Sequence, residues 1–152
     1  MLDLPEVVGR ATTRPRLTVI AGDVFAGVPE GFDTYLLVNV LHDWDDEDAT
    51  RILRRVAEAA ARRSRVVVVD SDHPTVTEDD LAVSADVLMA ALTTGGKERH
   101  IAAIAELGRA AGLRHERSVR LASADLGRAA GLRHERSVRL ASADLAHVLR
   151  PQ

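Results

Sequence analysis

The sequence predicts an α/β fold in which helices cover a mostly parallel sheet. Short apolar runs alternate along the chain with longer stretches of helical periodicity, which is typical of doubly wound α/β domains. The run Arg65–Asp70 (RVVVVD) is nearly all valine, as expected for a strand that is covered on both faces. The chain has 152 residues, of which 46% are hydrophobic, so it is long enough for one domain with a buried core.

Three strands and three helices are expected before Gly112, where the last of these helices should end. The expected strands are Leu17–Asp23, Thr34–Val40 and Arg65–Asp70. The expected helices are Asp46–Arg63, about Thr77–Leu92 and about Lys97–Ala111, with a turn at Gly95 and Gly96 between the last two. In the first helix the apolar residues fall on one face, and they are Ile52, Leu53, Val56, Ala59 and Ala60.

The carboxyl-terminal part contains an identical tandem repeat. Residues 107–125 read LGRAAGLRHERSVRLASAD, and residues 126–144 repeat this string without a change. Two copies are too few for a solenoid, so we interpret the pair as a recent duplication within a single domain that spans residues 1–152. Each copy has a helical piece and a strand-like piece. Strand alternation would place one set of residues on one face, namely Leu113, His115, Arg117, Val119 and Leu121.

Composition excludes several classes of function. The chain has 20 basic and 23 acidic residues in an interspersed pattern, with a net charge of −3, so no nucleic-acid partner is expected. There is no cysteine, which excludes disulfides and thiolate catalysis and favours a cytoplasmic location. No apolar run is long enough to span a bilayer, and no membrane partner is expected. No cluster of metal ligands stands out, and we interpret His115 and His134 as exposed repeat residues.

Polar residues follow the expected strands at four places. Asp3 ends a short strand-like segment, Asp23 follows VIAG, His42 and Asp43 follow TYLLVNVL, and Asp70 follows VVVV. Ligands of open α/β sheets bind at the carboxyl ends of the strands, so these side chains are candidates for a functional site. Taken singly, each is more readily explained as a solvated loop residue or a helix cap than as a catalytic residue.

Three ordered blocks strengthen the functional interpretation. They are DLPEVV, LLVNVLHDWDDEDATRIL and TTGGKERHIAAIAELGRAAGL, and together they span Leu2 to about Leu113. This segment resembles the S-adenosylmethionine-dependent O-methyltransferases that include the plant caffeate enzymes and bacterial polyketide-tailoring enzymes. The resemblance implies a Rossmann-like sheet, S-adenosylmethionine as cofactor, and methylation of a hydroxyl on an aromatic or polyketide-like small molecule. A general nucleotide-binding module would fit the fold, but it would leave LHDWDDED and GGKER unexplained.

The resemblance implies that His42 is the general base. It would take the proton of the substrate hydroxyl while the oxygen attacks the methyl group. A phenol and an imidazole differ by about 3.5 pKa units, or about 5 kcal/mol, so transfer concerted with attack is favoured over prior ionisation. Asp70 and Glu98 match the two acids that orient the base and stabilise its cation. Asp70 stands where the family usually has Glu, so its carboxylate reaches less far toward His42.

The resemblance also implies a cofactor site. Asp3 matches the acid that accepts hydrogen bonds from the ribose hydroxyls, and Asp23 matches a residue beside the adenine. Val24 and Trp44 are the expected apolar contacts of the adenine ring, although Trp44 could instead simply pack the loop. Val38 departs from the family, which usually has Lys near the cofactor at this point.

The family's first strand and its glycine-rich turn would precede Asp3, so we expect an incomplete sheet. The resemblance also implies a last, antiparallel strand at Leu145–Leu149 and an amino-terminal dimerisation domain that the 152 residues do not contain. Without a first strand, Thr34–Val40 would have an unpaired edge, which should pair with Leu17–Ile20, form a homodimer, bind a complementing chain or aggregate. Two hypotheses stay open: an O-methyltransferase enzyme, and a non-catalytic remnant or subunit that needs a separate chain.

Overall fold

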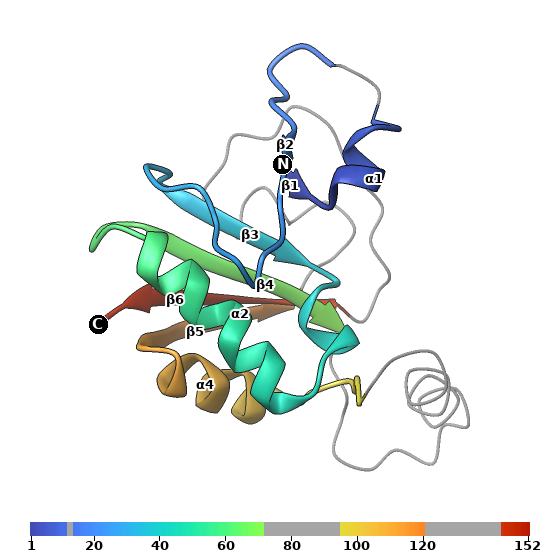
Figure 1. Ribbon diagram of the computed structural model, residues 1–152. Coiled ribbons are helices and arrows are strands. Elements are labelled where there is room, and N and C mark those ends of the chain that lie inside the picture. The colour runs from blue at the N-terminus through green and yellow to red at the C-terminus, as the bar shows by residue number, and fades with distance from the viewer. Residues whose placement is uncertain (12–13, 72–94, 121–143) are drawn as a thin grey trace.

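The fold is a mixed α/β sheet with helices on one face. A computed structural model describes residues 1–11, 14–71, 95–120 and 144–152 (Figure 1). The strands of its four-stranded sheet lie in the order β3-β4-β6-β5. They are β3 (Thr34–Val38), β4 (Arg65–Ser71), β5 (Leu113–Arg120) and β6 (Asp144–Pro151). The parallel pair β3–β4 and the antiparallel β6 confirm the predicted sheet with a last antiparallel strand, whereas the helix expected over residues 77–92 lies outside the described residues.

A second, two-stranded sheet lies beside the first. It consists of β1 (Leu2–Asp3) and β2 (Ile20–Ala21), which are parallel, and the short helix α1 (Pro5–Val8) stands between them in the chain. Within residues 17–23, where a full strand was expected, only Ile20 and Ala21 form one. Of the alternatives for the open edge of the larger sheet, pairing with Leu17–Ile20 is not the one that the structure shows, because the backbone N–H of Ile20 donates to the carbonyl of Met1 at 2.8 Å.

Within the described residues, strand β3 has an open edge, as predicted. Its only partner among the described strands is β4, and the side chain of Leu36 is 44% exposed. Hydrogen bonds join Arg65 N–H to the Asp33 carbonyl and Asn39 N–H to the Val69 carbonyl, each at 2.9 Å. Residues 33 and 39 therefore direct their backbone groups toward β4. Since direction alternates along a strand, the N–H and carbonyl of Leu36 point to the open edge.

Helix α2 (Asp46–Ala59) packs one apolar face on the sheet. The side chain of Asp45 caps its amino terminus by accepting a hydrogen bond from Asp48 N–H at 2.8 Å, and acidic residues fill the first turn, where the helix dipole favours them. The helix ends before the predicted Arg63, because Ala60 adopts an extended conformation with ψ of 125°. The predicted face is correct; its most buried members are Ile52, Leu53 and Val56.

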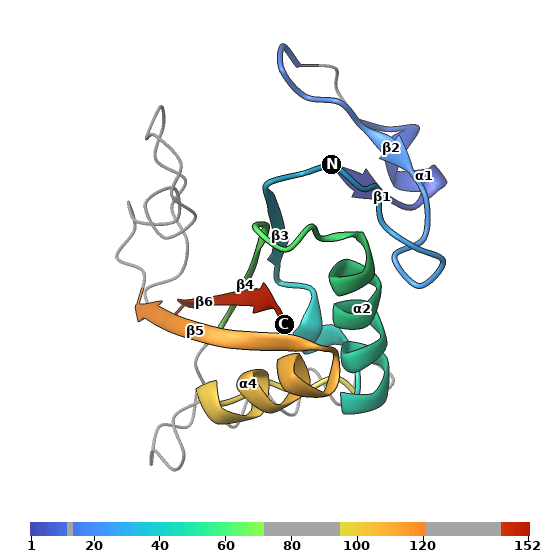
Figure 2. The ribbon, with the colours of Figure 1, turned by 90° about the vertical axis from the view of Figure 1, so that its left-hand side faces the viewer.

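Helix α4 (Ile101–Ala110) covers the same face of the sheet as α2 (Figure 2). It begins later than the predicted Lys97, because His100 acts as the N-cap and accepts a hydrogen bond from Ala102 N–H at 3.3 Å. Four consecutive residues of β4, Val66–Val69, are fully buried, which confirms that both faces of this strand are covered. None of the described helices has the length and apolar composition that a bilayer crossing requires.

The first copy of the repeat supplies the end of α4 and all of β5. A bulge between His115 and Arg117 breaks the regular alternation, so the prediction that both face the same way was wrong. Ser118 instead lies opposite His147, and its Oγ is 2.8 Å from both His115 Nε2 and His147 Nδ1. His115 is therefore half-buried and hydrogen-bonded rather than exposed. His134 lies outside the described residues.

The residue at one core position explains why the first copy of the repeat fits the end of α4 and strand β5. Ile104, in the amino-terminal half of α4, is 1% exposed within the hydrophobic core. The residue at the matching position before the second copy, 19 residues later, is Ser123. A helix continued into the second copy would therefore bring a hydroxyl to the place of a core isoleucine. Replacing such a side chain costs about 2 to 5 kcal/mol, which favours the first copy.

Deleting residues 126–144 should leave a folded chain. The joined sequence keeps Asp125 in the place of Asp144, and it shortens the connection between β5 and β6 by 19 residues. Shorter loop closure should raise the free energy of unfolding by about 1 kcal/mol. Urea denaturation of the two chains would measure this change, and a loss of several kcal/mol would show that the second copy is part of the core.

Candidate active site

Two strand ends bring the central residues of the site together. Strands β3 and β4 are parallel, and Val38 lies opposite Val69 at their carboxyl ends. The 3-10 helix η1 (Leu41–Asp43) follows β3 and carries His42, while Asp70 lies at the end of β4. Asn39, with φ of 52°, turns the chain between β3 and η1. The register of one strand pair thus brings His42 near Asp70.

Three carboxylates surround the imidazole of His42. Its Nδ1 is 3.4 Å from Glu98 Oε1 and 3.9 Å from Asp70 Oδ1, and its Nε2 is 3.4 Å from Asp43 Oδ1. The structure therefore brings together the three residues that the sequence nominated for catalysis. The longer distance to Asp70 agrees with its shorter side chain, since 3.9 Å exceeds the length of a hydrogen bond.

Burial makes these charges interact strongly. The side chains of His42, Asp70 and Glu98 are 17%, 4% and 10% exposed. The interaction with Glu98 raises the pKa of His42 above its ordinary value, helped by the charges of Asp70 and Asp43 and opposed by burial. Burial raises the pKa of Asp70 to about 7, with further repulsion from Glu98. The group is therefore suited to hold and release a proton near neutral pH.

Two atoms of this cluster have unused hydrogen-bonding capacity. His42 Nδ1 and Asp70 Oδ1 are both buried, and neither has a hydrogen-bond partner in the described part of the chain. Buried polar atoms without partners are costly, and they are found disproportionately at functional sites. The cluster thus holds a buried ring nitrogen and a buried carboxyl oxygen that lie 3.9 Å apart without a hydrogen bond between them.

The segment that carries Glu98 is fixed against the start of α2. Gly95 has φ of 88°, and a Cβ atom at this position would lie 3.2 Å from the Cβ of Asp45, so the glycine allows a close approach. Lys97 Nζ forms an ion pair with Asp46 at 2.7 Å. Asp46 also accepts a hydrogen bond from Arg99. The hydrogen bond from Lys97, and after it that from Arg99, hold the pKa of Asp46 below its usual range.

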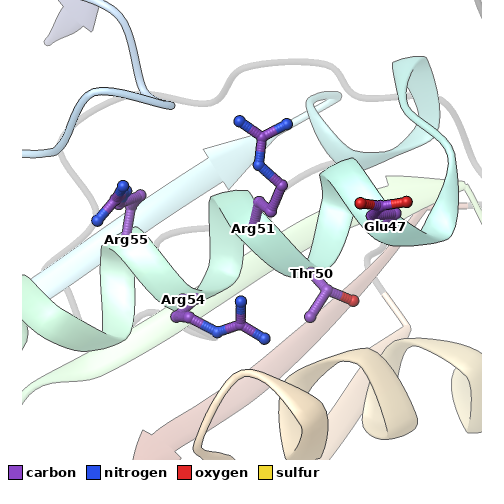
Figure 3. A pocket seen from close by; sticks show the side chains of 5 residues that line it. All are labelled: Glu47, Thr50, Arg51, Arg54 and Arg55. Carbon is purple, nitrogen blue, oxygen red and sulfur yellow. The ribbon is translucent and has the colours of Figure 1, made fainter.

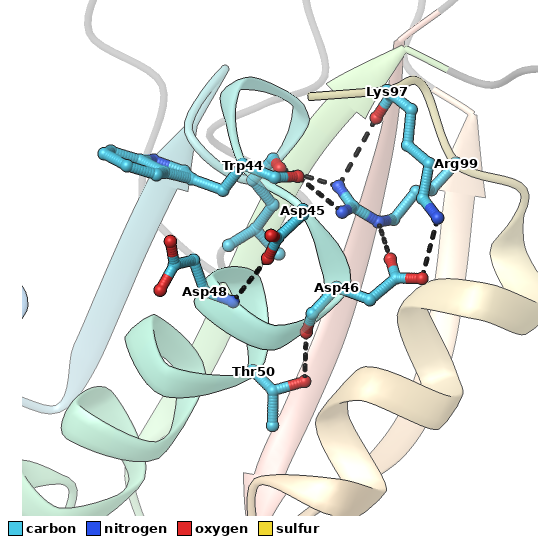
Figure 4. Close-up of polar contacts among 8 residues, drawn as sticks. Trp44, Asp45, Asp46, Asp48, Thr50, Lys97 and Arg99 are labelled. Atoms are coloured by element: carbon cyan, nitrogen blue, oxygen red, sulfur yellow. Dashed lines mark hydrogen bonds and ion pairs between the residues drawn. The ribbon is translucent and has the colours of Figure 1, made fainter. Parts of the chain in front are cut away.

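Arg99 is a residue that the sequence analysis missed. It is 4% exposed and donates to Asp46, to the Leu41 and Trp44 carbonyls on either side of His42, and to the Lys97 carbonyl (Figure 4). The available signal was weak, since it was only a basic residue directly after Glu98 and shortly before a helix. A charge in that setting is normally solvated, and only the three-dimensional structure shows that it is buried.

The two acids expected at the cofactor end lie at the same end of the small sheet. Asp3 pairs with Ala21, and Gly22 N–H donates to the Asp3 carbonyl at 2.9 Å, which brings Asp23 next to this strand end. Asp3 Oδ1 accepts a hydrogen bond from Leu4 N–H at 2.9 Å. Asp23 Oδ1 accepts one from Phe25 N–H at 2.8 Å.

The two apolar residues expected at the cofactor end also lie together. Val24 and Trp44 are both partly buried and pack against the hydrophobic core. The ring of Phe25 meets that of Trp44 edge to face, with centroids 4.8 Å apart, so the sequence analysis missed one aromatic member of this group. Trp44 follows η1 directly, which places the aromatic pair next to the His42 turn.

A hollow of about 430 Å³ lies elsewhere, on the exposed side of α2 (Figure 3). None of the residues nominated for catalysis or cofactor binding is among its described lining. Arg51 stacks 4.8 Å from the centre of the Phe25 ring, and Arg55 bonds to the Phe25 carbonyl, so two of its arginines hold the loop before β3. The described lining residues are Glu47, Thr50, Arg51, Arg54 and Arg55.

Comparison with known proteins agrees with this geometry. The chain is 36% identical over 114 residues to trans-anol O-methyltransferase 1 of Pimpinella anisum, covering 72% of this chain and 32% of that protein. It is 41% identical over 107 residues to the mitomycin biosynthesis 6-O-methyltransferase of Streptomyces lavendulae, covering 68% and 29%. The chain thus spans about a third of the length of these relatives.

Solved structures show the same fold. A methyltransferase of calicheamicin biosynthesis, in its S-adenosylhomocysteine-bound form, matches with a TM-score of 0.75 and 30% identity, covering 99% of this chain and 40% of that one. Its fold is the Rossmann-like fold of methyltransferases, of which this chain has an incomplete sheet. The family model of the O-methyltransferase domain matches residues 1–114. By sequence and by structure, this chain belongs to the O-methyltransferase domain family.

Proposed function

We propose that the chain is a partial catalytic domain, residues 1–152, that transfers a methyl group from S-adenosylmethionine to a hydroxyl of an aromatic or polyketide-like small molecule. The observation that carries this proposal is the half-buried imidazole of His42, whose Nδ1 faces the carboxylates of Glu98 and Asp70 at 3.4 and 3.9 Å. The relatives act, by name, on anol and in mitomycin biosynthesis, which agrees with such acceptors.

His42 would act as the general base. A neutral imidazole accepts the proton of the substrate hydroxyl, and the nearby carboxylates stabilise the cation that forms. The contact with Glu98 already raises the pKa of His42, so the charged ring is favoured in this site. Asp70, with its pKa of about 7, would contribute through its charge when it is ionised, and not through a hydrogen bond, because its oxygen lies 3.9 Å from Nδ1.

The residues at the strand ends fit part of an S-adenosylmethionine site. When bound, this cofactor supplies a methyl group on a positively charged sulfur. Asp3 and Asp23 each use one carboxylate oxygen for a backbone N–H, which leaves the other oxygen for the hydroxyl or amine groups of a nucleoside. Val24 and Trp44 offer apolar surface for the adenine ring. We also propose a cytoplasmic location, in agreement with the lack of cysteine.

We further propose that β3 receives a strand from a second copy of the chain or from a complementing chain. Its backbone groups at Leu36 point to an edge that no described strand occupies, and the side chain is 44% exposed. Edges of this kind pair readily with another strand. If the cofactor site needs that strand, the isolated chain is the subunit or remnant of the alternative hypothesis.

Cofactor binding can be tested by calorimetry with S-adenosylhomocysteine. Binding in the micromolar range should fall about 10-fold or more in Asp3→Ala and Asp23→Ala, because each loses a charged hydrogen-bond acceptor. Asp33→Ala, which removes an exposed acid away from these strand ends, should bind as the parent chain does. Absence of binding by the parent chain would support the non-catalytic remnant.

The same preparations test the role of His42. His42→Gln should keep S-adenosylhomocysteine binding but lose about 100-fold or more of methyl transfer from labelled S-adenosylmethionine to a panel of phenols. Equal transfer by the parent chain and this variant would exclude His42 as the base.

Asp70 should make the fold less stable as pH rises. Its pKa of about 7 in the folded chain lies above the ordinary value of 3.8, so its contribution is complete below that value and is lost as pH rises through about 7. Urea denaturation at about pH 5 and about pH 8 should show a fall in unfolding free energy that is smaller in Asp70→Asn by about 2 kcal/mol. Asp33→Asn is the matched control, and parallel profiles for the parent chain and Asp70→Asn would contradict the burial effect.

Strand addition at β3 predicts a specific response to proline. Leu36→Pro removes a backbone N–H that points to the open edge, without touching the bonds to β4, so it should abolish self-association in sedimentation equilibrium. Leu36→Ala keeps that N–H and should still associate. If both variants associate alike, main-chain pairing at this edge is excluded.

A further inference from the structure

The guanidinium of Arg99 is hydrogen-bonded to the turn that carries His42. Its Nη1 donates to the Leu41 carbonyl and its Nη2 to the Trp44 carbonyl, both at 2.6 Å, and Nε donates to Asp46 Oδ1 at 2.9 Å (Figure 4). The side chain is 2% exposed. A buried cation of this kind needs partners on all sides, and these carbonyls and the carboxylate provide them.

The two carbonyls stand on either side of the catalytic turn. Leu41 precedes His42, and Trp44 follows Asp43, so the guanidinium of Arg99 is hydrogen-bonded to carbonyls at both ends of η1. The turn has no side-chain cap of its own, and Leu41 and Trp44 are joined within it only by a 3.2 Å hydrogen bond. The backbone of the turn that carries His42 is therefore held by a group outside the turn.

Arg99 also fixes the acid that contacts the base. It follows Glu98 directly in the chain, so the same residue that holds the His42 turn anchors the Glu98 backbone. The 3.4 Å distance between His42 Nδ1 and Glu98 Oε1 joins two segments that Arg99 ties together. Asp46, at the start of α2, completes the junction by binding both Lys97 and Arg99.

We propose that Arg99 is a positioning residue, which sets the His42 imidazole against Glu98 by holding the Leu41 and Trp44 carbonyls. This inference rests on the proposed role of His42 as base. The flat fork of a guanidinium can donate to both carbonyls and to Asp46 at once, whereas the point charge of a lysine cannot reproduce that geometry.

The test is an NMR titration of the His42 ring in the full chain, with His42→Gln used to assign its signal. In Arg99→Lys the charge is kept but the fork is lost, and the pKa of His42 should fall toward 6.5 as the ring leaves Glu98. Arg99→Gln should lower it as well. If Arg99 acted only as a nearby charge, Arg99→Lys would leave this pKa unchanged and Arg99→Gln would raise it, and that result would overturn the proposal.

A second pair of variants serves if the Arg99 variants do not fold. Asp46→Asn weakens the contact with Arg99 Nε at a side chain that is 55% exposed, and Asp48→Asn removes the same charge two residues further along α2. The pKa of His42 should fall more in Asp46→Asn than in Asp48→Asn, and equal shifts would overturn the proposal. Because the titration needs no methyl transfer, a shift in Arg99→Lys without activity in the parent chain would contradict the proposed function and leave the positioning role intact.

Discussion

The parallel pairing of β3 with β4 is the constraint on which the site depends. Five residue pairs, from Thr34 opposite Arg65 to Val38 opposite Val69, fix the two strand ends at one edge. The residues at and after the ends of these two strands are therefore close in space, and they include the turn with His42 and the carboxyl group of Asp70. A slip of one residue would turn Asp70 to the other face of the sheet, so the valines that bury β4 also fix the position of Asp70 relative to His42.

Much of the fold could be predicted because its strongest elements are encoded locally. The valine run of β4 and the apolar face of α2 each determine their own structure, and both were predicted correctly. The bulge at His115 was not, because it depends on the partner strand that places Ser118 opposite His147. The short β2 was overestimated for a similar reason: its extent is limited by β1, a partner of only two residues.

The cluster that we propose for catalysis was predictable by resemblance, whereas the residues that support it were not. His42, Asp70 and Glu98 lie in motifs that can be recognised in the chain, and the structure brings all three together. Arg99 carries no such signal, since its partners are mainly backbone carbonyls, which any sequence provides. The same holds for Phe25, whose contact with Trp44 joins two loops distant in the chain. The role of a side chain that bonds to the backbone of another segment can be recognised only when the positions of both segments in the structure are known.

The hydrogen-bonded row of His115, Ser118 and His147 has a consequence for the tautomers of its rings. A serine hydroxyl carries a single hydrogen, so Ser118 can donate to only one of the two nitrogens that lie 2.8 Å from its Oγ. At least one of the two rings must therefore present its own N–H to the serine oxygen. A change of tautomer that withdraws this N–H in one strand then requires the ring on the other strand to supply it.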